Sequence, residues 1–255
     1  MTPPATPAIR RFDDLDALSR AAADELGALA RAAVAARGTC HVALSGGSTP
    51  RRLFELLAAR GAGALPWRQL ALWWGDERTV PPDHPDSNYR MAREALIEPA
   101  AAFGLGPAQV HRIAGEPPDH DAAALAYERE LVAALGAPPV LDLVLLGMGP
   151  DGHTASLFPG SAALGEASRW VVANRVTSPL VHGTTTRLTL TAPAINAARC
   201  VWFLVAGADK AGALAQVVAG PRNPALYPAQ LVAPSSGELV WFVDAAAASA
   251  LGARA

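Results

Sequence analysis

One acid and one imidazole stand together in a glycine-rich loop in the middle of the sequence. The loop follows an apolar stretch at residues 141–146 and contains Asp151 and His153. Glycines after a buried strand let the backbone approach a ligand, because no Cβ stands in the way. A histidine there can exchange a proton near neutral pH. A tight turn with a surface histidine is the alternative, but the glycine-rich setting favours a catalytic site.

A second glycine-rich loop joins an apolar strand at residues 41–44 to a helix expected at 50–59. Hydroxyl groups and the free N–H groups of a helix start can form a pocket for an anion, and phosphate is the natural candidate. The loop is neither a Walker A sequence nor a Gly-x-Gly-x-x-Gly fingerprint. An ordinary turn capped by Ser48 or Thr49 is the alternative. The candidate binding residues are Ser45, Gly46, Gly47, Ser48 and Thr49.

Charged residues follow two further apolar strands. Asp76, Glu77 and Arg78 come after the strand at 70–74, and arginine binds phosphate or carboxylate in a fixed geometry. Lys210 follows the strand at 201–205 and begins a helix, where the helix dipole disfavours a cation unless an anion is bound. Solvated charges are the alternative in both cases. Asn88 and Arg187 are further candidates for the same site.

Apolar runs alternate with helical patterns along the chain. This order predicts an α/β fold with three layers, a doubly wound and mostly parallel sheet covered by helices on both faces. Ligands of such sheets bind outside the carboxyl ends of the strands, where these loops begin. Strands are expected at residues 41–44, 70–74, 111–113, 141–146, 170–174, 187–191, 201–205 and 239–243. Helices are expected at 15–36, 50–59, 87–97, 121–135 and 208–218 and in the alanine-rich end of the chain.

The bulk composition limits the classes of function. The chain has 255 residues, a net charge of −2 and scattered arginines. This pattern does not predict a basic surface of the kind that binds nucleic acid. It contains no apolar run long enough to span a bilayer and no signal peptide, so we expect a cytoplasmic protein. We expect a flexible N-terminus at residues 1–8 and a single domain at 9–255.

Cysteine and histidine usage argues against disulfides and metals. Cys40 and Cys200 both lie on predicted strands and are expected to be reduced core thiols. The segment 83–88 contains histidine and aspartates, but no other ligand cluster supports a metal site, so it is expected to be a loop with Asp86 or Ser87 capping a helix. His120 and His182 are expected at the surface or in loops. We expect neither metal nor cofactor.

Taken together, these motifs resemble the 6-phosphogluconolactonase family. The resemblance rests on Ala-Leu-Ser-Gly-Gly-Ser-Thr-Pro at 43–50, Trp-Gly-Asp-Glu-Arg at 74–78, Asp-Ser-Asn-Tyr at 86–89, the glycine-rich stretch 147–160, Arg-Leu-Thr-Leu-Thr at 187–191 and the turn at 207–210. They occur in the family's order over most of the chain between residues 41 and 210.

The resemblance implies hydrolysis of 6-phospho-D-glucono-1,5-lactone to 6-phospho-D-gluconate, the second step of the oxidative pentose phosphate pathway. It also implies a fold related to glucosamine-6-phosphate deaminase, no required metal, and a monomer or homodimer that binds a small sugar-phosphate lactone. His153 would be the general base and then the acid, with Asp151 orienting it. The Ser45 loop, Arg78 and Lys210 would hold the phosphate, and Asp76, Asn88 and Arg187 would complete the binding site.

Two other functions remain open. A glucosamine-6-phosphate deaminase-like isomerase shares the fold, but its pattern after Asp-Gly-His is typically Ile-Gly-Phe-Asn-Glu-Pro, which supplies an acid. This chain has Thr-Ala-Ser-Leu-Phe-Pro at 154–159, and Arg78 stands where the deaminase pattern has tyrosine. A non-catalytic sugar-phosphate sensor is the second alternative. Such a sensor would have no need of a titratable histidine. Sensors on this fold usually carry a DNA-binding module, and we expect no helix-turn-helix domain ahead of Leu44.

Overall fold

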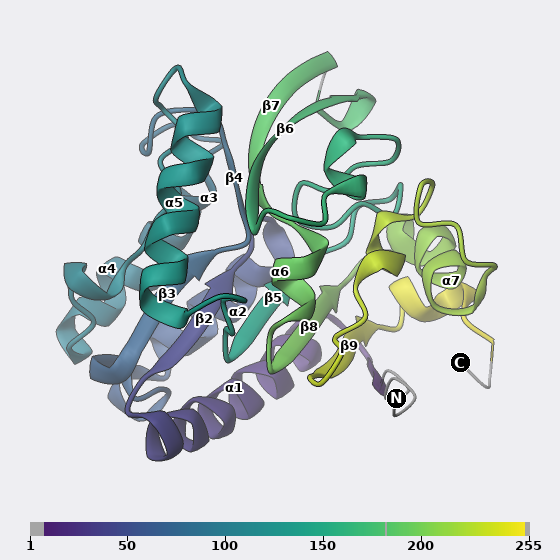
Figure 1. Cartoon of the computed structure of the whole chain (residues 1–255). Helices are drawn as coiled ribbons and strands as arrows, with labels where there is room; N and C mark the ends of the chain where they lie inside the picture. The colour runs from purple at the N-terminus through teal and green to yellow at the C-terminus, as the bar shows by residue number, and fades with distance from the viewer. Residues whose placement is uncertain (1–7, 182, 253–255) are drawn as a thin grey trace.

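The computed structural model describes residues 8–181 and 183–252 (Figure 1). In this part of the chain, six parallel strands form the main sheet in the order β1-β9-β8-β5-β2-β3. Their side chains are mostly buried, as expected for a parallel sheet covered on both faces. The strands are β1 (Ala8–Phe12), β2 (Cys40–Leu44), β3 (Leu70–Trp74), β5 (Leu143–Leu146), β8 (Cys200–Val205) and β9 (Glu238–Asp244).

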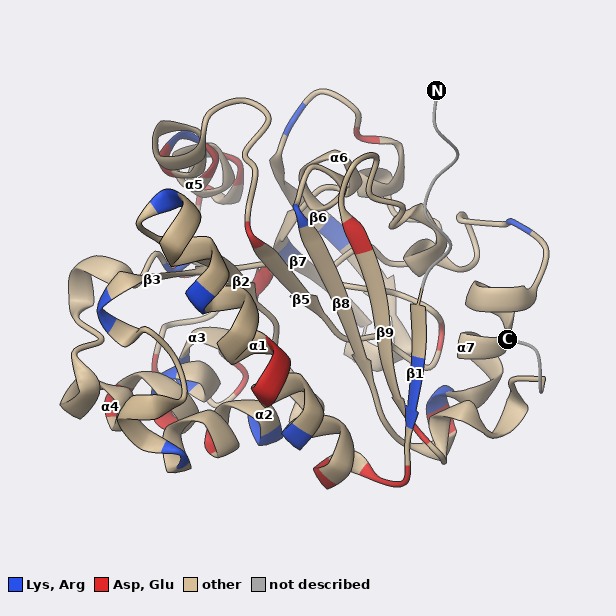
Figure 2. Ribbon diagram, turned by 90° about the horizontal axis from the view of Figure 1, so that it is seen from below, with Lys and Arg blue, Asp and Glu red and all other residues tan. Residues whose placement is uncertain are grey.

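Helices cover both faces of this sheet, which confirms the expected fold class. In Figures 1 and 2, α1 and α2 lie on one face, and α5 and α6 lie on the other. Figure 2 also shows acidic and basic residues intermingled along α1 and α2. The helices are α1 (Leu15–Arg37), α2 (Ser48–Ala59), α3 (Asn88–Ala92), α4 (Glu98–Ala100), α5 (His120–Leu135), α6 (Ala192–Asn196) and α7 (Ala211–Ala219).

A second, antiparallel sheet was not expected from the sequence. It consists of β4 (Asp76–Arg78), β7 (Gly183–Leu190) and β6 (Val171–Ser178), in the order β4-β7-β6. Gly75 joins the two sheets, because its N–H donates to Leu44 O at 2.8 Å and its carbonyl accepts from Leu190 N at 2.8 Å. The charged residues after β3 therefore form a short strand at the boundary between the sheets.

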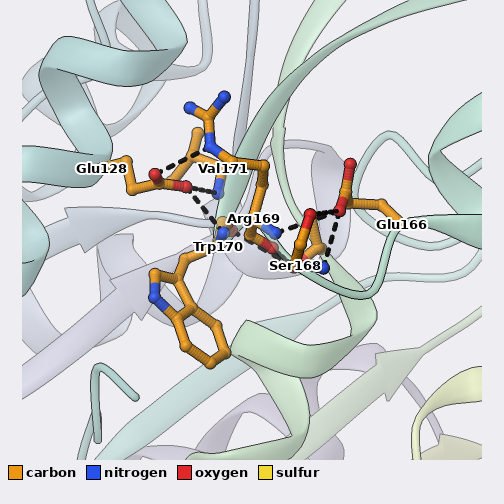
Figure 3. A network of polar contacts seen from close by, with 7 residues as sticks. Glu128, Glu166, Ser168, Arg169, Trp170 and Val171 are labelled. Carbon is orange, nitrogen blue, oxygen red and sulfur yellow. Dashed lines mark hydrogen bonds and ion pairs between the residues drawn. The ribbon is translucent and has the colours of Figure 1, made fainter. Parts of the chain in front are cut away.

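Glu128 on α5 fixes the beginning of β6 in this small sheet (Figure 3). Its carboxylate accepts hydrogen bonds from the backbone N–H groups of Trp170 at 2.6 Å and Val171 at 2.9 Å, and from Arg169 Nε at 2.8 Å. Glu166 caps the preceding turn, and the hydrogen bonds from Ser168 lower the pKa of this carboxyl to about 2. The turn before β6 is thus held to α5 through the Glu128 carboxylate.

Several predicted elements differ in the structure. Residues 111–113 form no strand, and the pairing with β3 is limited to a single bridge between Val110 and Leu72, in which His111 N donates to Leu72 O at 2.8 Å. The alanine-rich C-terminus forms only a short 3-10 turn at Ala247–Ala250, since a segment this short hardly nucleates an α-helix. The helix expected at 87–97 does begin after the N-cap Ser87, but it contains a π-helical turn at Arg93–Ile97.

The N-terminal boundary differs from the expectation, whereas the two cysteines agree with it. Residues 1–7 lie outside the described part, and Ala8, expected to be flexible, begins β1 beside β9. Cys40 and Cys200 are free and buried, as expected. Burial raises the pKa of the Cys40 thiol to about 12 and that of Cys200 to about 11, so neither is an activated nucleophile. Among the described helices, none is long and apolar enough to cross a membrane.

Candidate active site

A cavity of about 310 Å³ lies where loops from both sheets meet. Loops that follow β2, β5 and β8 line it at the carboxyl edge of the main sheet, and β4 contributes from the small sheet. This is the position at which open parallel sheets bind ligands. Of the predicted site residues, the cavity lining contains Ser45, Gly46, Gly47, Ser48, Thr49, Asp76, Arg78, Asn88, His153 and Lys210.

His153 lines the cavity and forms a hydrogen-bonded pair with Asp151, which is not among the lining residues. Their Nδ1 and Oδ1 atoms are 2.6 Å apart, and the backbone N–H of His153 donates to the same oxygen at 3.1 Å. Burial alone would raise the pKa of Asp151, but the hydrogen bond and the charge of His153 outweigh it and lower this pKa. An ionised Asp151 accepts the Nδ1–H of the imidazole, which fixes the orientation and the tautomer of the ring.

Two neighbours define where the imidazole lies. The Phe158 ring stacks on it with centroids 4.0 Å apart. Gly149 lies so close that a Cβ at this position would be 2.1 Å from His153 Nδ1 and 2.7 Å from Asp151 Oδ1. The glycine-rich sequence thus makes room for the His–Asp pair.

The helix α2 begins at the wall of the same cavity. Its N-cap is Gly47, with no side-chain cap, so the expected cap by Ser48 or Thr49 is wrong. The first N–H groups of α2 are consequently not taken up by a capping side chain, and Ser45 Oγ is buried without a hydrogen-bond partner. These groups suit an anion, which the helix dipole would also favour.

Two cationic side chains line the same cavity. The guanidinium of Arg78 donates to the carbonyl of Asp86, and Lys210 Nζ pairs with Asp209 at 2.8 Å. Arg187 does not line the cavity but stands opposite Arg78 in the β4–β7 register. Burial and the charge of Arg78 lower the pKa of Arg187. A bound anion would relieve this repulsion between neighbouring like charges.

The two acids of the Asp-Glu-Arg motif have different positions. Asp76 lines the cavity, whereas Glu77 is 3% exposed and accepts the N–H groups of Arg78, Asn88 and Tyr89. Burial raises the pKa of Glu77, although these hydrogen bonds oppose the shift. Glu77 thus holds the start of α3 against β4, and of the two acids only Asp76 lines the cavity.

Sequence reasoning missed several residues of the site. Met148, Ala155 and Leu180 line the cavity, and Ser156 supports it with a buried hydroxyl. Ala155 has a φ of 47°, a strained backbone conformation of the kind found at functional sites. A positive φ at alanine leaves no signal in the sequence, and Leu180 approaches from the small sheet.

The remaining histidines and carboxylates do not extend the site. His120 was expected at the surface or in a loop but is the first residue of α5 and is half-buried, and His182 lies outside the described residues. The described residues contain no group of three or more His, Cys, Asp or Glu side chains that could hold a metal ion.

A family model described as glucosamine-6-phosphate isomerases/6-phosphogluconolactonase matches residues 13–241. A curated 6-phosphogluconolactonase from Synechocystis is 45% identical over 83% of this chain and 85% of its own length. The crystal structure of a Trypanosoma cruzi 6-phosphogluconolactonase is 32% identical, with a TM-score of 0.84 over 96% of this chain and 97% of that chain. A monomeric glucosamine-6-phosphate deaminase is 20% identical, with a TM-score of 0.78 over 95% of this chain and 99% of that chain, which shows the shared fold alone.

Fold and cavity together define an α/β protein with a candidate active site at the carboxyl edge of a parallel sheet. The chain belongs to the glucosamine-6-phosphate isomerase/6-phosphogluconolactonase family. Within this family, the curated relatives identify it as a lactone hydrolase.

Proposed function

We propose that this enzyme hydrolyses 6-phospho-D-glucono-1,5-lactone to 6-phospho-D-gluconate in the oxidative pentose phosphate pathway. One observation carries the proposal: a single cavity is lined both by His153, which pairs with Asp151, and by the α2 start with Arg78 and Lys210, which we call the cationic end. A phosphate bound by this cationic end would orient the lactone carbonyl toward His153. Binding energy from this non-reacting group would then lower the barrier for hydrolysis.

The proposed reaction needs one proton carrier. With Nδ1–H directed to Asp151, the Nε2 atom of His153 takes a proton from water while the water oxygen attacks the lactone carbonyl. The tetrahedral intermediate collapses when the ring C–O bond breaks, and the imidazolium returns the proton to the departing ring oxygen. Asp151 stabilises the transient imidazolium, since its lowered pKa keeps the carboxylate ionised.

The residues after His153 favour this reaction over that of an amino-sugar deaminase. Residue 158, within the stretch where the deaminase pattern supplies an acid, is the phenylalanine that stacks on the imidazole. An aromatic face fixes the histidine but transfers no proton. A sensor without catalysis is disfavoured by the His153–Asp151 geometry, which binding alone would not require.

A head-to-head assay tests the function. Freshly generated 6-phosphogluconolactone and glucosamine-6-phosphate are offered separately, with acid release measured for the first and ammonia release for the second. We expect acid release well above the spontaneous rate and no ammonia. Ammonia release without lactone hydrolysis would establish the deaminase alternative, and neither product would favour the sensor.

Gly149→Ala is expected to lower kcat about a hundredfold, because a displacement of about 1 Å in a catalytic group has an effect of this size. The added methyl group must push the His153 ring from its place beside Asp151. Steady-state kinetics of the folded variant measure the effect. Gly165→Ala is the matched control, since a Cβ there meets nothing within 4 Å. Equal kcat values for the two variants would contradict the assigned role of Gly149.

The expected cytoplasmic location, the absence of nucleic-acid partners and the choice between monomer and homodimer stay predictions. So does the absence of a cofactor. The proposed mechanism draws only on side chains of this chain and on water.

A further inference from the structure

A hydrogen bond crosses the cavity wall between segments far apart in the sequence. Ser156 Oγ donates to Asp76 Oδ2 at 2.6 Å. Ser156 follows His153 by three residues, whereas Asp76 belongs to β4 of the small sheet. Both side chains are buried, with exposed fractions of 1% for Ser156 and 8% for Asp76. A short bond between a hydroxyl and a carboxylate in such surroundings is stronger than an ordinary hydrogen bond.

The backbone around Ser156 is itself held by the small sheet. Its N–H donates to Thr189 Oγ1 at 3.2 Å, and its carbonyl accepts from Asn174 Nδ2 at 2.8 Å. These two bonds hold the backbone of Ser156 in place. Its hydroxyl can therefore hold the Asp76 carboxylate in a fixed position. The adjacent Ala155, with its positive φ, turns the chain between His153 and this anchor.

Asp76 continues the connection toward the anion end of the cavity. Asn88 Nδ2 donates to the backbone carbonyl of Asp76 at 2.9 Å and to its Oδ1 at 3.2 Å. The amide of Asn88 lies directly against Gly46, where a Cβ would be 1.8 Å from Asn88 Oδ1. A series of contacts thus leads from the catalytic loop through Ser156, Asp76 and Asn88 to the glycine-rich loop before α2.

The chemistry of Asp76 indicates what it binds. An ionised carboxylate only accepts hydrogen bonds, so it would repel a phosphate and attract hydroxyl groups. Asn88 lines the same wall and holds the Asp76 carboxylate in place through its Nδ2, while its Oδ1 is buried against Gly46. The wall therefore suits the hydroxyl groups of a sugar ring held between the cationic end and His153.

We propose that Ser156 is a positioning residue that acts through Asp76, which receives ring hydroxyl groups of the sugar-phosphate lactone and sets the ring in register with His153. The inference rests on the proposed lactonase function and adds the part of the site that recognises the ring. Loss of the Ser156 hydroxyl leaves Asp76 Oδ2 without its donor, so the carboxylate turns away from its working position. The phosphate contacts at the other end of the cavity stay unchanged.

A double-mutant cycle on the full-length protein tests this inference. Ser156→Ala, Asp76→Ala and the double variant are assayed with 6-phosphogluconolactone, and inorganic phosphate is used as a competitive inhibitor. We expect Ser156→Ala to lower kcat/KM about tenfold, the effect of one hydrogen bond to a charged group. In the Asp76→Ala background, Ser156→Ala is expected to lower kcat/KM by less than about twofold, because the carboxylate that accepts the Ser156 hydrogen bond is already absent. The inhibition constant for phosphate is expected to stay within about twofold of the wild-type value in Ser156→Ala.

Thr154→Val provides the control for simple loosening of the loop. The Thr154 hydroxyl is equally buried and donates to Gly147 O at 2.8 Å, without contact to Asp76. Thr154→Val should therefore lower kcat/KM by the same factor in the wild-type and the Asp76→Ala backgrounds. Equal costs of Ser156→Ala in both backgrounds, or a loss of phosphate inhibition as large as the loss of kcat/KM, would overturn the inference.

The experiment must separate loss of folding and loss of the lactonase function from failure of this inference. Thermal melting establishes that each variant is folded, and if Asp76→Ala does not fold, the comparison of kcat/KM with phosphate inhibition in Ser156→Ala still decides. Failure of the lactonase proposal would leave the wild type inactive on the lactone. If the present inference fails, the wild type is active on the lactone, but the effects of Ser156→Ala and Asp76→Ala on kcat/KM simply add in the double variant.

Discussion

Replacement of His153 by alanine is expected to lower kcat about a thousandfold, within the range that a general base contributes. KM should stay close to the wild-type value, because the anion-binding end of the cavity does not include the imidazole. The variant loses both the base that activates water and the acid that protonates the leaving oxygen. Initial rates of acid release from fresh lactone, corrected for spontaneous opening, provide the measurement.

A second histidine supplies the matched control. His120 begins α5 and does not line the active-site cavity, so His120→Ala should retain full activity. Titration of His153→Ala with 6-phosphogluconate should show a dissociation constant within about threefold of the wild-type value, since ground-state binding is largely retained. Near-normal hydrolysis by His153→Ala would rule out the imidazole as the base. A parallel loss of binding would instead assign it to substrate contact.

The central part of the site was predictable because local sequence determines it. Strands of a covered parallel sheet are apolar on both faces, so β2, β5 and β8 stand out in the sequence. The loops after such strands converge at one edge, which brings the Ser45 loop, His153 and Lys210 to one cavity. A local contact also explains the glycine at position 149, because a larger residue would overlap with the His153–Asp151 pair.

What escaped prediction depends on contacts between distant segments. The small antiparallel sheet brings β4 beside β7, more than 100 residues later, and three-residue strands carry too little pattern to be recognised. Glu77 resembles a surface acid in the sequence but is buried because it accepts three N–H groups. The Ser156–Asp76 bond spans 80 positions, so no spacing rule could have indicated it.

The segment after Gly220, without a motif in the sequence, also acquires a place in the structure. Tyr227 packs against Gly152, where a Cβ would be 2.9 Å from the tyrosine ring, and Ala229 N donates to Gly152 O at 2.9 Å. Gln230 holds this segment together through its contacts with Asn223 N and Pro221 O. The loop that carries His153 is therefore supported from outside as well as from the small sheet.

Lys210→Ala is expected to raise KM about 10-fold to 100-fold, the effect of one charge-assisted hydrogen bond, with a smaller change in kcat. The ammonium lies in the cavity lining and pairs with the exposed Asp209, a partner that a phosphate dianion can replace. Lys210→Arg should recover only part of the affinity, because a planar guanidinium places its donors differently from the compact ammonium of lysine. Unchanged KM in both variants would place the phosphate elsewhere.

A direct measurement is possible because Lys210 is the only lysine in the sequence, alongside 20 arginines. An amine-reactive reagent can therefore modify only this side chain and the N-terminal amine, which peptide mapping distinguishes. We expect 6-phosphogluconate and inorganic phosphate to slow the modification of Lys210, while that of the N-terminal amine stays constant. Protection by 6-phosphogluconate but not by phosphate would assign Lys210 to the sugar rather than to the phosphate. Protection by neither would remove it from the binding site, and the cationic end of the cavity would then rest on Arg78 and the start of α2.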